Sequence, residues 1–263
     1  MPSPSWEDYL EFAEALAAAA AKEILPHFRT RLSVDNKLEQ GFDPVTEADR
    51  AGERAMRAMI EARFPDHGIV GEEYGAKEGR SPFSWILDPV DGTRSFIFGM
   101  PTWTTLIALA HEGRPVVGLM HQPYVGESFL GSPSGSLHRR AGETRRLAVN
   151  PAASLEQALG TTTGPHLYRS DRQRKGLAAM QARLKAIRYD ADAYFFCLLA
   201  AGQIDIALDA GLAAYDIAPL IPIIEGAGGI VTTWDGASAA SGGDILAAAS
   251  PALQAEAMSL LAG

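Results

Sequence analysis

The amino-acid sequence predicts a layered α+β fold, and three features of the chain support this prediction. Hydrophobic residues make up 47% of the 263 positions and charged residues 21%, which provides enough apolar surface for a substantial core. Helix-type segments open the chain, and short apolar segments separated by Gly, Pro and Asp follow them. After Pro151, helical and strand-like segments alternate. Mixed elements of this kind pack as layers of helices and sheets.

Two helices are expected near the N-terminus. Residues 6–31 are rich in Ala, Glu and Leu, which favour helices, and Pro26 should kink or end this helix. Thr46 can cap a second helix that runs to about Arg63. An apolar stripe on that helix predicts which face is buried; it is formed by Met56, Met59 and Ile60.

Strands and helices should then build two halves of one compact unit, residues 1–150 and 151–263. Five strands are expected in the first half, at Ile69-Val70, Phe83 to Leu87, Trp103 to Ala110, Val116 to Met120 and Ser128 to Leu130. The second half should contain helices at 171–184, 193–201, 217–225 and 251–261, and strands at 204–208, 230–233 and 245–248.

Composition argues against several classes of partner and site. The formal net charge of -9 leaves no basic surface for nucleic acid. The apolar run Ala15 to Ala21 is too short to span a bilayer, so no membrane is expected. Cys197 is the single cysteine and lies in an apolar run, which predicts a buried thiol and a reducing cytoplasm. One cysteine and no His-x-x-x-His pattern also argue against a zinc site.

The sharpest chemical feature is the segment from Trp85 to Thr93, Trp-Ile-Leu-Asp-Pro-Val-Asp-Gly-Thr. An apolar strand ends there in Asp88 and Asp91, and the surrounding proline and glycine allow both carboxylates to point into one space. The Val90 carbonyl is a third candidate oxygen ligand for Mg²⁺, which prefers such oxygens. Gly92-Thr93 predicts a helix start whose free amides would receive phosphate oxygens. Taken alone, such a turn could equally hydrogen-bond its own backbone.

Three further acidic segments are candidates for the same site. Gly71-Glu72-Glu73 follows an apolar pair, so Glu72 could share a metal with Asp88, although solvated surface charge is the alternative. Tyr215-Asp216 precedes an apolar helix, where Asp216 could be a ligand, an N-cap or both. The segment Asp43 to Asp49 is either a capped helix start or part of the site.

Taken in order, these four segments resemble the ordered motif set of the inositol monophosphatase family over nearly the whole chain. The resemblance implies the layered αβαβα sandwich of the inositol monophosphatase / fructose-1,6-bisphosphatase type, a homodimer, and two or three Mg²⁺ ions per subunit. The implied ligands are Glu72, Asp88 and the Val90 carbonyl for the first ion, and Asp88, Asp91 and Asp216 for the second. By the same resemblance Gly92 and Thr93 would bind phosphate, and the attacking water would be oriented by Thr93, Asp49 and Glu72.

The implied activity is hydrolysis of a small phosphate ester, and the implied substrate rests on a finer resemblance. Residues 94–101 differ from the Thr-Asn-Phe-x-His of inositol phosphatases and are similar to the histidinol-phosphate phosphatase branch of histidine biosynthesis, as are residues 42–49 and 215–222. The residues expected to face the substrate are Arg94, Asp192, Asp209 and Asp216. Two acids, Asp192 and Asp209, suit the cationic groups of histidinol.

One departure from that branch keeps other functions open. The branch usually has Gly-Gly-Asp-Cys-Tyr where this chain has Asp-Ala-Asp-Ala-Tyr at 190–194. An inositol monophosphatase or broad sugar-phosphate phosphatase is therefore the alternative, and a catalytically silent phosphate-binding protein is a third.

Overall fold

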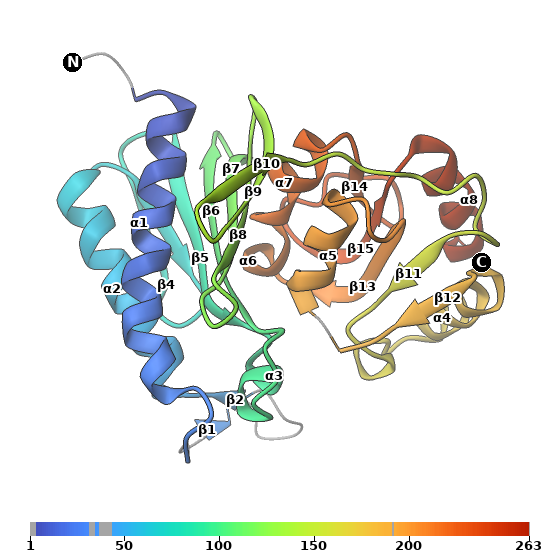
Figure 1. The fold of residues 1–263 in the computed structure, drawn as a ribbon, viewed down its shortest axis with the longest axis horizontal. Coiled ribbons are helices and arrows are strands. Elements are labelled where there is room, and N and C mark those ends of the chain that lie inside the picture. Colours follow the sequence, from blue (N-terminus) through green and yellow to red (C-terminus); the bar gives the residue numbers. More distant parts are fainter. Residues whose placement is uncertain (1–3, 32–34, 37–43, 191, 263) are drawn as a thin grey trace.

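Five layers of helices and sheets make up the chain (Figure 1). The computed structural model describes residues 4–31, 35–36, 44–190 and 192–262. In order, the layers are helices α1 and α2, an eight-stranded sheet, helices α5 to α7, a five-stranded sheet, and helices α4 and α8. The predicted αβαβα sandwich is confirmed.

Helices α1 (Trp6–Ile24) and α2 (Glu47–Arg63) form the first layer. Each begins with a capping box, on Ser5 and on Thr46, in which the cap and the third helical residue satisfy each other's backbone amides. The expected helix over 6–31 is too long, because Pro26 ends it in a short 3₁₀ turn, Leu25–His27.

The eight-stranded sheet, called the first sheet below, has the order β10-β9-β8-β7-β6-β5-β3-β4. All neighbouring strands are antiparallel except β3 and β5, which are parallel. Its strands are β3 (Gly68–Gly71), β4 (Gly75–Lys77), β5 (Phe83–Asp91), β6 (Thr104–His111), β7 (Arg114–Gln122), β8 (Glu127–Ser132), β9 (Gly135–Arg140) and β10 (Glu143–Arg146). Because β3 and β5 run in the same direction, their carboxyl ends meet at one edge.

The middle layer and the second sheet come from the C-terminal part of the chain. The helices are α5 (Asp192–Ala200), α6 (Ala214–Ile217) and α7 (Leu220–Gly226). The second sheet has the order β12-β11-β13-β15-β14. Its strands are β11 (Leu159–Thr161), β12 (Ala186–Arg188), β13 (Ile206–Leu212), β14 (Ile230–Thr233) and β15 (Gly243–Ala248). Helices α4 (Asp171–Arg183) and α8 (Pro251–Leu261) cover its outer face.

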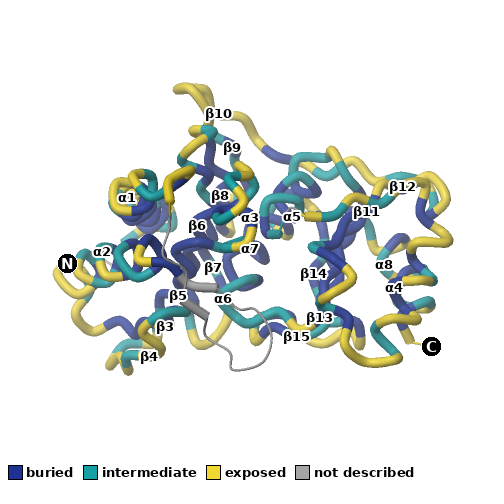
Figure 2. Tube along the Cα trace, turned by 90° about the horizontal axis from the view of Figure 1, so that it is seen from below, coloured by how far each residue is buried: buried dark blue, intermediate teal, exposed yellow. Residues whose placement is uncertain are grey.

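Hydrophobic side chains fill the spaces between the layers, and Figure 2 shows buried backbone along the central strands of both sheets. The first core lies between α1, α2 and the first sheet and contains Trp85 and Trp103. The second surrounds the middle helices and includes Cys197, which is buried as predicted. The third lies beneath α4 and α8. Among the described residues, no helix is both long and apolar enough to cross a membrane.

Most predicted elements are present, with two kinds of error. The expected helix 217–225 is two helices, α6 and α7, because Pro219 has no amide hydrogen to continue a regular helix. Within the two large sheets, five short strands were not expected from the sequence, namely β4, β9, β10, β11 and β12, and the separate pair β1 (Asp35–Asn36) and β2 (Pro44–Val45) was not expected either. The small elements α3 (Thr93–Ile97) and the 3₁₀ turn Pro165–Leu167 complete the described chain.

Candidate metal and phosphate site

A β-bulge in β5 brings Asp88 and Asp91 to the same side of the first sheet. Side chains three positions apart on a regular strand point to opposite faces. Here Asp88 pairs with Leu106 and Asp91 with Thr104, so two residues of β5 oppose the single residue Thr105. The Thr105 hydroxyl donates to the Pro89 carbonyl at 2.8 Å, which satisfies a buried backbone acceptor within the bulge. The extra residue turns both carboxylates into one space.

Asp216 completes a cluster of three carboxylates. Asp88, Asp91 and Asp216 each offer an oxygen within 4.8 Å of the others. Asp216 is the third residue of α6, and one of its oxygens accepts the Ala213 amide at 2.7 Å, so the side chain caps the helix while it faces the cluster.

Burial and mutual repulsion raise the pKa values of the carboxylates in this cluster. Burial, together with the negative charges of Glu72, Asp91 and Asp216, raises the pKa of Asp88 well above its usual range. Burial raises the pKa of Asp216 to about 7. A divalent cation would relieve this repulsion, and the all-oxygen donor set suits Mg²⁺. The residues therefore fit the metal that the family resemblance implies.

Glu72 lies beside this cluster on a turn that a buried carboxylate holds in place. The charge of Glu72 contributes to the raised pKa values of Asp49, Asp88 and Asp216. Glu53 in α2 is fully buried and accepts the backbone amides of Glu73 at 2.7 Å and Tyr74 at 3.2 Å. Glu53 also pairs with Arg57 at 2.6 Å. The sequence reasoning missed Glu53, although a charge on the same buried face as Met56 was a signal for it.

Asp49 faces the site from the first turn of α2. Its Oδ2 accepts the Thr46 amide at 2.9 Å and the Thr46 hydroxyl at 2.6 Å. The Thr93 hydroxyl lies 3.5 Å from Asp49 Oδ1 and 3.1 Å from the Val90 carbonyl. Burial raises the pKa of Asp49 to about 6. Capping and facing the site are thus combined in this residue. The first residue of its motif, Asp43, lies outside the described residues.

Gly92 sits where the second half of the chain meets the first. Its φ of 76° favours glycine, and a Cβ there would come within 2.7 Å of Asp192 Oδ2. Asp192 accepts the Ser95 hydroxyl at 3.1 Å, and the Ala193 amide donates to Asp91 at 2.9 Å. Burial raises the pKa of Asp192 to about 6, against the effects of the Ser95 hydrogen bond and of a nearby cation, the exposed Arg94.

A cavity of about 160 Å³ adjoins the carboxylate cluster. Four acids line it, namely Asp91, Asp192, Asp209 and Asp216, opposite an apolar wall of Leu167, Phe196, Leu212 and Leu220. Asp209 is the most enclosed of these acids, because it accepts the hydroxyls of Thr162 and Thr163 and the Thr163 amide at 2.6 to 2.8 Å. Burial raises its pKa to about 7. All four acids were predicted site residues.

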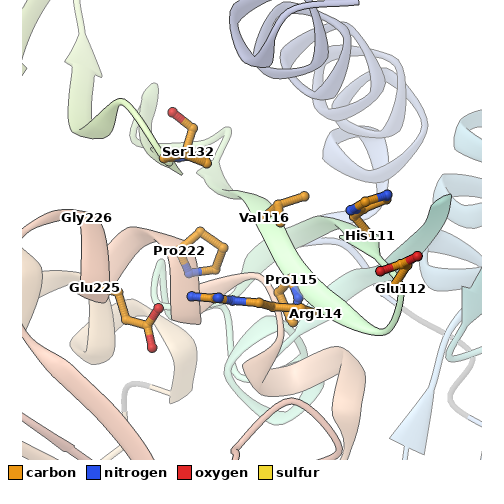
Figure 3. Close-up of a pocket in the computed structure, with 10 residues that line it drawn as sticks. His111, Glu112, Arg114, Pro115, Val116, Ser132, Pro222, Glu225 and Gly226 are labelled. Atoms are coloured by element: carbon orange, nitrogen blue, oxygen red, sulfur yellow. The ribbon is translucent and has the colours of Figure 1, made fainter. Parts of the chain in front are cut away.

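A larger cavity, of about 600 Å³, lies elsewhere, between the β6–β7 hairpin and α7 (Figure 3). The side chain of Arg114 extends across it toward Glu225, and Glu112 lies at its far side. None of the predicted site residues lines this cavity. Its mixed charges and its prolines offer no carboxylate cluster comparable to that around Asp88.

Comparisons with known proteins agree with this geometry. The model of the inositol monophosphatase family matches residues 5–262. A chloroplastic bifunctional phosphatase of Arabidopsis thaliana, IMPL2, is 39% identical over 224 residues, which are 84% of this chain and 63% of the plant protein. A histidinol-phosphatase of Chlorobaculum parvum is 33% identical over 251 residues, 93% of each chain.

A solved structure also matches this chain over nearly its whole length. An inositol monophosphatase from Zymomonas mobilis has 35% sequence identity and a TM-score of 0.87, with 99% of this chain and 100% of the other covered. The family match extends over nearly the whole chain, and the bulged Asp88–Asp91 segment carries the motif that first suggested it. This chain therefore belongs to the inositol monophosphatase family.

Proposed function

We propose that this protein is a Mg²⁺-dependent phosphomonoesterase that hydrolyses L-histidinol phosphate to L-histidinol and phosphate. The choice of substrate rests on one observation: Asp192 and Asp209 line the cavity beside the carboxylate cluster. Histidinol carries an amine and an imidazole, whereas an inositol ring offers only neutral hydroxyls. Acids facing the non-phosphate part of a substrate favour the cationic one.

Asp192 is the stronger of the two candidates for binding the cation. Among the described residues, Asp192 accepts a side-chain hydrogen bond from Ser95, whereas Asp209 already accepts three hydrogen bonds. The apolar wall that includes Leu167 and Phe196 would contact the imidazole ring. Asp209 would then supply negative charge at longer range.

The carboxylates would hold Mg²⁺ in the roles that the resemblance implies: Glu72, Asp88 and the Val90 carbonyl for one ion, and Asp88, Asp91 and Asp216 for another. Bound there, the metal would activate water and stabilise the charge of the phosphate in the transition state. Glu72, Asp49 and Thr93 would together orient the attacking water. The Thr93 hydroxyl and Asp49 Oδ1 lie 3.5 Å apart. The amides of Gly92 and Thr93 would position the phosphate at the start of α3.

Relatives named histidinol-phosphatase support the proposal, since those of Chlorobaculum parvum and Mycobacterium tuberculosis are 33% and 31% identical over more than nine tenths of this chain. We propose that the enzyme works as a homodimer in cytoplasmic histidine biosynthesis, in line with the resemblance. A second candidate is an inositol monophosphatase or broad sugar-phosphate phosphatase. The Zymomonas mobilis structure favours it, as does the altered segment 190–194, of which residue 191 lies outside the described residues.

The proposal is tested by phosphate release from histidinol phosphate, myo-inositol 1-phosphate and fructose 1,6-bisphosphate, each with Mg²⁺ and with EDTA. We expect Mg²⁺-dependent hydrolysis with a strong preference for histidinol phosphate. Metal-dependent hydrolysis of only the other two esters would contradict the proposed substrate but would support the proposed phosphatase activity. Activity on none of them would favour a phosphate-binding protein.

A pair of variants separates charge recognition from general damage. Asp192→Asn should lower kcat/KM for histidinol phosphate at least roughly tenfold, because a partly desolvated charge pair is lost. Asp190→Asn is the matched control, since it removes an exposed charge from the same loop. Equal effects of the two variants would contradict a role for Asp192 in binding the cation.

A further inference from the structure

Helix α5 starts with a strained connection that touches the site. Asp190 has a φ of 68° and Asp192 a φ of 44°, in the left-handed region that non-glycine residues rarely adopt. Such strain persists only where the surroundings fix the backbone. On the site side, the Ala193 amide donates to Asp91 Oδ2 at 2.9 Å, and Asp192 accepts the Ser95 hydroxyl. The first turn of α5 thus directly contacts a member of the carboxylate cluster.

The same turn is tied to the first sheet by Tyr194. The Tyr194 hydroxyl donates to Glu127 Oε1 on β8, and Glu127 is only 6% exposed. The other carboxylate oxygen of Glu127 pairs with His138 Nε2 on β9 at 2.8 Å. Arg145 on β10 donates to His138 Nδ1 at 3.2 Å, so Nε2 must carry the ring proton and donate it to Glu127. A chain of hydrogen bonds, buried at Glu127 and His138, therefore runs from the exposed edge of the first sheet to α5.

The Glu127–His138 centre of this chain of hydrogen bonds is protected from water and separate from the site. The Phe129 ring covers it, with its centroid 4.6 Å from the His138 ring and 6.3 Å from the Tyr194 ring. Neither Glu127 nor Tyr194 lines the cavity beside the carboxylate cluster. A buried carboxylate keeps its place only when its hydrogen bonds are satisfied, so Glu127 fixes the Tyr194 hydroxyl and with it the start of α5.

We propose that Tyr194 is a positioning residue for the metal site: anchored by Glu127, it holds the first turn of α5 so that the Ala193 amide orients Asp91. The amide donates to Asp91 Oδ2, and in this proposal Oδ1 is the oxygen that would bind the metal. The inference rests on the proposed role of Asp91 as a Mg²⁺ ligand. It assigns Glu127, His138 and Arg145 to supporting that ligand from the opposite sheet edge, and it gives none of them a part in the chemistry.

The test measures Mg²⁺ binding to the metal-free full chain by calorimetric titration, without substrate. Tyr194→Phe should raise the Kd for Mg²⁺ roughly three- to tenfold, the effect of one buried hydrogen bond on the orientation of a ligand. Tyr124→Phe is the matched control, because it removes a tyrosine hydroxyl that is bonded to Arg29 at 2.6 Å on the exposed surface. Its Kd should equal that of the wild type.

A second variant guards against simple misfolding. Glu127→Gln keeps the shape of the side chain but turns an amide donor toward Tyr194 or His138, and it should raise the Kd similarly. The double variant should bind Mg²⁺ no more weakly than the worse single variant, because both changes act on the same chain of hydrogen bonds. Melting temperatures in EDTA show whether each variant is folded.

The outcomes separate this inference from the proposed function. An unchanged Kd in folded Tyr194→Phe, or a wild type that binds no Mg²⁺, would overturn the positioning role even if histidinol phosphate is hydrolysed. A raised Kd in both variants would support it even if the substrate proves to be another phosphate ester.

Discussion

Replacing the buried Glu53 by Gln should destabilise the protein and weaken its metal site together. The carboxylate of Glu53 is fully buried and binds two backbone amides and Arg57, so glutamine would place an amide donor against the Glu73 amide or against Arg57. A buried donor without an acceptor and a broken buried ion pair together cost about 3 kcal/mol. For a domain of this size, that corresponds to a fall in melting temperature of about 6 to 12 °C. Because the same turn carries Glu72, the Mg²⁺ concentration for half-maximal activity should also rise.

Helix α2 offers a matched control. Glu61→Gln is the same substitution on the same helix, and it too breaks an ion pair. The partner of Glu61 is Lys77 on β4, at 3.0 Å. Both partners there are exposed, so the expected cost is less than about 1 kcal/mol. Differential scanning calorimetry and Mg²⁺ titrations of both variants compare them directly. Equal melting temperatures would refute the reasoning that burial, and not the ion pair itself, gives Glu53 its effect.

Three further predictions concern the site itself. Asp88→Asn should abolish phosphate release and Mg²⁺ binding, yet melt no lower than the wild type in EDTA, because it removes a repelled buried charge; retained activity would contradict the metal assignment. The folded protein holds the Asp209 proton up to a pKa of about 7, against 3.8 for an ordinary aspartate, so wild-type stability falls as pH rises between these values. Asp209→Asn escapes this loss, so its free energy of unfolding relative to the wild type should rise by about 3 kcal/mol from pH 5 to 8, measured as a growing difference in melting temperature; a constant difference would argue against the raised pKa. Gly92→Ala should lower kcat at least about tenfold, since its Cβ would press on Asp192 at a φ of 76°, and kinetics equal to the wild type would refute the tight contact.

The elements that could be predicted are those whose burial shows in the local sequence as an apolar run or an apolar stripe. Strands β5, β6 and β7 are long and apolar because both of their faces are covered, and α2 has a cap and an apolar stripe. Strand β10 was missed because all of its residues, Glu-Thr-Arg-Arg, are exposed at the sheet edge. Strand β12 is likewise a short edge strand. Such strands are specified by a neighbour's backbone, which sequence periodicity does not report.

The site divides in the same way. The sequence pattern singled out Asp88, Asp91 and Asp216, and the resemblance assigned all three as ligands. The structure brings these carboxylates together, although α6 and β5 are more than 120 positions apart in the chain. The supporting residues were missed because each acts through a distant partner. Ser95 holds Asp192 across 97 positions, and Tyr194 reaches Glu127 across 67. No local pattern marks such pairs, because their meaning depends on how the layers stack.

The bulge in β5 makes the site sensitive to the pairing register of the strand as well as to its composition. Asp88 and Asp91 share a side only because one surplus residue stands opposite Thr105. A substitution that straightened this stretch without shortening it would leave every acidic residue of the site in the gene, yet the regular pleat would turn Asp91 to the opposite face of the sheet. The site therefore depends on the backbone irregularity being kept as much as on the acidic side chains themselves.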